Sequence, residues 1–185
     1  MFKYFEDLSK LCDGIQAQGQ DGKNIDIKTA FNLSISAVKK ASKSGKKIIF
    51  IGNGGSASIA SHMAIDFWKN GRMKAVSFND PAQLTCLAND YGYEYVFEKP
   101  IEFFGEEGDV LVAISSSGKS ENIIKGVKAA LAKKIQVITM SGFTKDNLLR
   151  KMGSLNFFVP SDSYGFVEII HGAICHCVLD TILCE

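Results

Sequence analysis

The first chemically distinctive segment, Gly52–Ser56, reads Gly-Asn-Gly-Gly-Ser and follows the apolar run Lys47–Ile51. Glycine lets the backbone turn sharply and approach a ligand closely, and free N–H groups at the start of a helix attract anions. The segment matches neither the phosphate loop of nucleoside triphosphatases nor the dinucleotide fingerprint. A plain strand-to-helix turn needs only one or two glycines, so this composition favours an anion site. Its candidate ligand-binding residues are Asn53, Gly54, Gly55 and Ser56.

A second segment, Ser115–Ser120, places four hydroxyls and a glycine around the expected start of a helix. Hydroxyls, backbone N–H groups and the helix dipole can together hold a phosphate without a neighbouring cation. Helix capping is the simpler explanation, but it needs only one serine. No acidic ribose-binding residue accompanies the two segments, so they favour one phosphate and several sugar hydroxyls over a dinucleotide. The candidate phosphate ligands are Ser115, Ser116, Ser117 and Ser120.

Titratable side chains stand on two apolar helical stretches. His62 and Asp66 are separated by four residues, which places both on one face of a helix. His176 lies between apolar neighbours, where a buried imidazole needs either a partner or a role. A hydrogen-bonded core histidine and a solvated carboxylate are the simpler interpretations of His62 and Asp66. His171 is more typical of a structural or interface histidine.

Short apolar strands that alternate with helices must position these residues. Such alternation predicts an α/β fold, a flavodoxin-like three-layer sandwich with a five-stranded parallel sheet. In such sheets, ligands bind at the carboxyl ends of the strands. The expected strands span residues 47–51, 75–78, 109–114, 135–140 and 155–159. The expected helices span residues 3–20, 27–44, 57–69, 80–91, 123–133 and 166–183, with one more opening at 141–147.

Bulk properties restrict the class of protein. The 185 residues have a formal net charge of +1, with 21 basic and 20 acidic side chains. This balance lacks the excess of basic residues that is typical of proteins that bind nucleic acid or an anionic membrane. Five cysteines without a zinc-binding spacing are typical of reduced thiols. We expect a cytoplasmic protein without a signal peptide or membrane span, because its apolar runs are short. Residues 1–185 are expected to form one domain, in which residues 1–45 are a helical extension that packs on the sheet or on a partner subunit.

The two Ser/Gly segments resemble those of the SIS domain superfamily. Within it the chain resembles the phosphoheptose isomerase family in its two leading helices, the stretch Ala88–Gly92 and the histidine-bearing last helix. This resemblance covers nearly the whole chain. It implies interconversion of sedoheptulose 7-phosphate and D-glycero-D-manno-heptose 7-phosphate through an enediol. It also implies a homotetramer with sites between subunits, and zinc in several members.

The resemblance assigns roles to particular residues. Asp66 takes the position of the general base, and His176 that of the general acid. Asp90 and Glu168 join the substrate-binding set. The metal set would be His62, Asp66, Glu168 and His176.

Three departures from the family pattern keep alternatives open. The base position holds Asp66 where the family has glutamate, position 168 holds glutamate where the family has glutamine, and the family's aspartate before the last helix is absent. A small displacement of a catalytic base can cost on the order of 100-fold in rate. One alternative is therefore a non-catalytic SIS-domain module that binds sugar phosphates or bridges proteins. The other is an isomerase of a different sugar phosphate.

Overall fold

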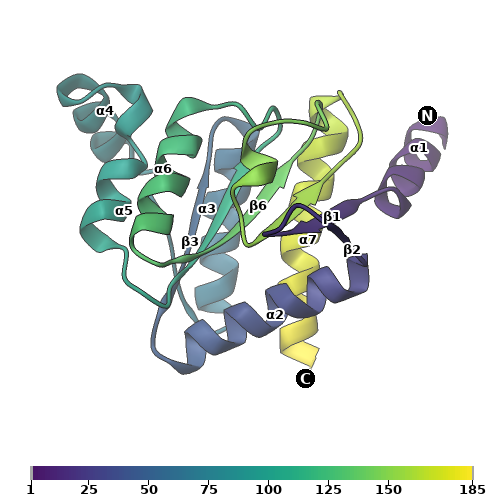
Figure 1. Ribbon diagram of the computed structural model, residues 1–185, viewed down its shortest axis with the longest axis horizontal. Coiled ribbons are helices and arrows are strands. Elements are labelled where there is room, and N and C mark those ends of the chain that lie inside the picture. The colour runs from purple at the N-terminus through teal and green to yellow at the C-terminus, as the bar shows by residue number, and fades with distance from the viewer. Residues whose placement is uncertain (1, 185) are drawn as a thin grey trace.

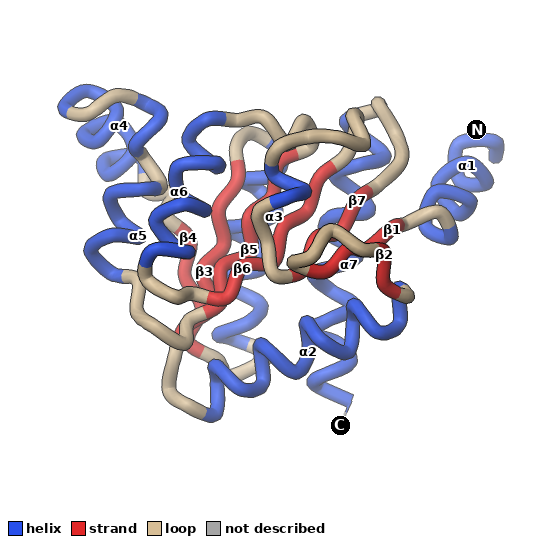
Figure 2. Tube along the Cα trace, viewed as in Figure 1, coloured by secondary structure: helices blue, strands red, loops and turns tan. Residues whose placement is uncertain are grey.

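The computed structural model describes residues 2–184, which form a seven-stranded sheet between two layers of helices (Figures 1 and 2). The strand order is β2-β1-β7-β6-β5-β3-β4. The strands are β1 (Gln16–Gly19), β2 (Asn24–Ile25), β3 (Lys47–Gly52), β4 (Lys74–Ser77), β5 (Val110–Ser115), β6 (Gln136–Ser141) and β7 (Leu155–Phe158). The helices are α1 (Phe2–Asp13), α2 (Ile27–Lys43), α3 (Gly55–Lys69), α4 (Pro81–Asp90), α5 (Glu98–Phe104), α6 (Glu121–Ala132) and α7 (Tyr164–Cys184), with 3₁₀ turns η1 (Tyr93–Tyr95) and η2 (Leu149–Lys151).

The five parallel strands β3 to β7 confirm the predicted α/β sandwich and its flavodoxin-like order. Each is short and apolar because both of its faces are covered. In β3, Ile48 and Phe50 pack in the core beneath α2, α3 and α7, whereas Ile49 and Ile51 pack in the core beneath α4, α5 and α6.

The expected first helix, residues 3–20, is too long. α1 ends at Asp13, and residues 16–19 instead form β1, which pairs antiparallel with β7. Gly14 follows the helix, and the edge of β7 supplies backbone partners that an amphipathic pattern cannot reveal. The sheet therefore has two antiparallel strands beyond the five that were predicted, β1 and β2.

Two other segments differ from the prediction. Residues 142–148 do not open an α-helix; they form a loop that ends in η2. The backbone of this loop bonds to the serine segment, where Gly142 N–H donates to Ser116 O at 2.9 Å. Helix α5 was not predicted at all, although its Ile101 is fully buried.

Helix α7 passes beside α2 and α3 (Figure 1). Among residues 2–184, this helix alone is long and apolar enough to cross a bilayer, with a mean hydropathy of 1.6 over 18 residues. The expectation that no segment reaches that length was therefore too strong. Core helices of soluble proteins share the same properties, so the property alone is weak support for a membrane span.

Candidate functional site

The two Ser/Gly segments meet at one edge of the sheet. Gly52–Ser56 follows β3 and Ser115–Ser120 follows β5, and these two strands are parallel neighbours. After β3 the chain continues to β4 on one side of β3, and then returns to β5 on the opposite side of β3. This reversal of strand order is the place where open α/β sheets bind ligands.

The two segments enclose a cavity of about 340 Å³. Its lining is made of amides, hydroxyls, backbone and one carboxylate, with no lysine or arginine among the described residues that form it. The lining residues are Asn53, Gly54, Gly55, Ser56, Ile114, Ser115, Ser116, Ser117, Ser120, Tyr164 and Glu168. All eight residues predicted from the two segments line this cavity, and each is a glycine or carries a polar side chain that suits an anion.

The glycine segment is shaped for close approach. Gly54 is the N-cap of α3 and has φ of 53° and ψ of −124°, a conformation that strongly favours glycine. Gly55 opens α3 directly against the Glu168 side chain, and a Cβ atom at this position would overlap the carboxyl group. The absence of side chains therefore leaves the first turn of α3 open to the cavity, with Glu168 from α7 beside it.

The serine segment keeps its hydroxyls in the cavity wall. The Ser115 and Ser120 Oγ atoms lie 3.3 Å apart, and Gly118 N–H donates to Ser115 Oγ at 3.2 Å. Ser120 is the N-cap of α6, yet its side chain makes no capping bond. The buried Ser116 hydroxyl has no partner among the described residues, although buried hydroxyls are normally paired. Helix capping therefore does not account for these serines.

A second cluster lies further along the same two helices. His62 Nε2 is 3.3 Å from Asp66 Oδ2, and the His62 and His176 rings are 5.5 Å apart. One ligand atom from each of His62, Asp66 and His176 lies within 4.8 Å of the others. Two imidazole nitrogens and a carboxylate oxygen form a donor set that zinc accepts, with a position left for water or substrate.

Glu168 lies outside this cluster. It precedes His176 by eight residues, which is about 12 Å along a helix axis, and its side chain lines the cavity of the serine segment. Of the predicted metal set, the structure thus brings together three residues and places the fourth toward the expected phosphate end.

Two other predicted positions lie apart from the cavity wall. Asp90 ends α4, where its carboxylate accepts hydrogen bonds from Cys86 Sγ at 3.5 Å and Asn89 Nδ2 at 2.9 Å. The bond to Asp90 raises the pKa of the Cys86 thiol. His171 is fully buried in α7, and burial lowers its pKa to about 4. Its Nε2 lies 3.2 Å from Ser141 O, as expected for a structural histidine.

Three residues at the cavity were not predicted from the sequence. Ile114 and Tyr164 line it, and Asn122 is bonded to Asn53 behind it. Tyr164 was excluded because the last helix was expected to begin at residue 166. Asn122 directly precedes two isoleucines, and this was the signal available in the sequence. A polar side chain beside such apolar residues is buried and needs a hydrogen-bond partner.

Comparison with known proteins agrees with this geometry. The SIS domain family model matches residues 3–142, which include both segments and the His62–Asp66 pair. The chain is 38% identical over 144 residues to the phosphoheptose isomerase of Fusobacterium nucleatum, covering 75% of this chain and 73% of that protein. It is 34% identical over 186 residues to the phosphoheptose isomerase of Yersinia pestis, covering 95% and 92%.

A solved structure extends the match to the whole fold. The phosphoheptose isomerase of Francisella tularensis aligns with a TM-score of 0.85 and 27% identity, over 99% of this chain and 96% of that one. The alignment therefore includes α7 and its His176 as well as the loops. The chain belongs to the SIS domain family and, within it, to the phosphoheptose isomerases.

Proposed function

We propose that this protein interconverts sedoheptulose 7-phosphate and D-glycero-D-manno-heptose 7-phosphate. The observation that carries the proposal is the convergence of both Ser/Gly segments on one cavity, with an imidazole–carboxylate cluster further along α3 and α7. The phosphate would lie against the hydroxyls and N–H groups of Ser115–Ser120. The sugar would extend along Asn53–Ser56 and Glu168 toward His176.

Asp66 and His176 would carry the proton transfers. Asp66 takes a proton from C1 of the ketose while His176 protonates the C2 oxygen, which gives the enediol. Asp66 then returns a proton to C2, the C1 hydroxyl gives its proton back to His176, and the aldose results. The steps balance without an external oxidant or reductant, and general acid–base groups of this kind contribute roughly 10²–10⁴-fold each.

The His62, Asp66 and His176 donor set suits a zinc ion. When bound, zinc would polarise the sugar carbonyl and so favour proton loss from the neighbouring carbon. Asp66 is also within reach of Asn70, whose Nδ2 lies 3.3 Å from Asp66 Oδ1. This contact holds the shorter carboxylate in place whether or not a metal is present.

We propose that the protein is a cytoplasmic homotetramer with its sites between subunits. Helix α1 buries no residue within one chain and projects away from the sheet (Figure 1). Exposed apolar groups continue along α3 and α7 next to the His62 cluster, including Ile65, Trp68 and Ile169. A neighbouring subunit would cover these groups and enclose the cluster, while five free cysteines suit a reducing compartment.

Turnover of sedoheptulose 7-phosphate by the purified protein tests the proposal. We expect Asp66→Ala and His176→Ala to lose at least 100-fold in kcat, and Asp21→Ala, which changes an exposed carboxylate in the β1–β2 turn, to retain wild-type activity. Chelation followed by zinc addition, together with His62→Ala, separates a metal requirement from acid–base chemistry. Sugar-phosphate binding without turnover by the wild type would overturn the isomerase proposal and favour a binding module. Turnover of another sugar phosphate alone would reassign the substrate.

A further inference from the structure

The Asn53 side chain in the cavity wall takes part in a closed hydrogen-bond network. Asn53 Nδ2 donates to Asn122 Oδ1 at 2.9 Å, and Asn122 Nδ2 donates back to Asn53 Oδ1 at 2.8 Å. The Tyr93 hydroxyl donates to the same Asn53 oxygen at 3.0 Å. Three segments that are distant in sequence therefore meet at one amide: the end of β3, η1 and the first turn of α6.

The orientation of both amides follows from one backbone bond. Ile123 N–H donates to Asn122 Oδ1 at 2.9 Å, and a backbone N–H can only donate. The Asn122 atom that it meets is therefore the carbonyl oxygen, so the Asn53 atom facing that oxygen must be the NH₂ group. The other Asn53 atom is then the oxygen that accepts from Asn122 and from Tyr93.

This network leaves Asn53 with one free donor. A side-chain amide has two N–H donors and two acceptor positions. Both acceptor positions of Asn53 and one of its donors are used by Asn122 and Tyr93. We infer that Asn122 and Tyr93 are positioning residues that fix the Asn53 amide, so that a single N–H is presented to a phosphate or hydroxyl oxygen in the cavity. This inference rests on the proposed sugar-phosphate site.

Packing holds the tyrosine in place. The η1 turn follows Gly92, whose φ of 104° reverses the chain after α4. Lys125 of α6 lies 4.1 Å from the centre of the Tyr95 ring, and Val96 and Phe97 are buried directly after the turn. Tyr93 is itself 55% exposed, so its hydroxyl can be removed without opening the core.

The Tyr93→Phe substitution tests the network, with Tyr91→Phe as its matched control because Tyr91 is 56% exposed and lies two residues away. We expect Tyr93→Phe to lower kcat/KM about 3- to 10-fold, mainly through KM, since it loses one neutral hydrogen bond. Tyr91→Phe should match the wild type. Asn122→Asp, which keeps the acceptor and removes the donor, should show a larger loss of kcat/KM per folded molecule.

A double-mutant cycle separates positioning from general damage. In an Asn53→Ala background, Tyr93→Phe should have no further effect, because its hydroxyl then has no oxygen to hold. An equal loss in both backgrounds, or an effect of Tyr91→Phe equal to that of Tyr93→Phe, would overturn the inference. If the wild type binds sedoheptulose 7-phosphate but does not isomerise it, the proposed reaction fails, and the same cycle measured on the calorimetric Kd still tests the network.

Discussion

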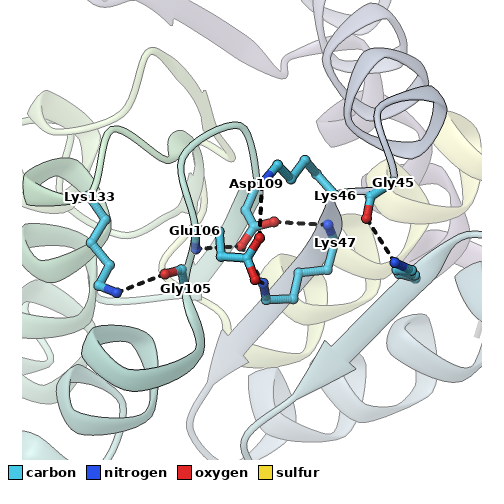
Figure 3. Close-up of polar contacts among 8 residues, drawn as sticks. Gly45, Lys46, Lys47, Gly105, Glu106, Asp109 and Lys133 are labelled. Atoms are coloured by element: carbon cyan, nitrogen blue, oxygen red, sulfur yellow. Dashed lines mark hydrogen bonds and ion pairs between the residues drawn. The ribbon is translucent and has the colours of Figure 1, made fainter.

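The two edges of the central sheet use polar residues in opposite ways. At the amino ends of β3 and β5, the fully buried Asp109 carboxylate accepts from Lys47 Nζ at 2.8 Å, Lys47 N–H at 2.9 Å and Glu106 N–H at 2.8 Å (Figure 3). Lys46 Nζ lies 2.9 Å from the Glu106 carboxylate, and this bond holds the pKa of Glu106 below its usual value. Charges here are matched by groups of the same chain.

At the carboxyl ends of the same strands, polar groups are left available for hydrogen bonds to a ligand. Ser120 occupies an N-cap position without capping, and the buried Ser116 hydroxyl has no hydrogen-bond partner within residues 2–184. No lysine or arginine occurs among the described residues that line the cavity. One edge of the sheet therefore satisfies its polar groups by internal pairing, whereas the other keeps them available for a ligand.

Asp109→Ala should break the paired edge and give the largest effect. Removing the carboxylate leaves Lys47 and two backbone N–H groups short of an acceptor, and breaking a buried pair of this kind costs about 3–5 kcal/mol. Urea unfolding should report this loss, while kcat per folded molecule stays at the wild-type value. Glu106→Gln is the control, since the Glu106 carboxylate is exposed to solvent and its midpoint should barely move. A drop in kcat with intact folding would contradict the division between the two edges.

His171 is a buried titratable group near the ligand edge, where its Nε2 lies 3.2 Å from Ser141 O at the end of β6. Burial lowers its pKa from an ordinary value near 6.5 to about 4, so the native state holds the neutral ring. Its stabilisation is complete above pH 6.5 and is lost as the pH falls toward 4, by about 3 kcal/mol in total. Urea midpoints measured from pH 7 to pH 4 should fall less steeply in His171→Gln than in the wild type. An unchanged slope in His171→Gln would refute the assignment.

Ser120→Ala should give the smallest effect on stability and a specific effect on binding. Its hydroxyl makes no capping bond, and its 3.3 Å contact with Ser115 Oγ is long for a hydroxyl pair, so the unfolding free energy should change by no more than about 0.5 kcal/mol. A hydrogen bond to a charged phosphate is worth about 1.5–3 kcal/mol, so sugar-phosphate affinity should fall roughly 10- to 100-fold in calorimetry. Asp80→Ala provides the contrast, because Asp80 caps α4 through Gln83 N–H at 2.9 Å. That variant should lose ~1 kcal/mol of stability at unchanged affinity.

The sequence predicted the elements and segments whose structure is decided by neighbouring residues. Apolar runs predicted all five parallel strands to within a residue or two, and the Asp80–Pro81 start of α4 is confirmed. The two Ser/Gly segments follow β3 and β5 as predicted, because the apolar run before each segment marks the strand. The family resemblance supplied the His62, Asp66 and His176 cluster, which spacing alone left open.

The features that the sequence did not predict depend on contacts between distant parts of the chain. β1 was mistaken for helix because its partner, β7, lies at the other end of the sequence. Glu168 was expected beside His176, but the eight-residue spacing separates them along α7, and Glu168 lies against Gly55 instead. The Asn53–Asn122–Tyr93 network joins three elements and has no sequence period of its own.

The pairing of β1 with β7 also has a consequence for biosynthesis. Gly19 leaves the ribosome well before its partner Leu155, which is 136 residues further along the chain. The parallel strands β3 to β6 can pair as they emerge, whereas β1 has no native neighbour on the β7 side until β7 itself has been synthesised. Because distant pairings form slowly and unpaired strands invite aggregation, we expect the nascent N-terminal segment to be the part of this protein that most needs chaperone protection.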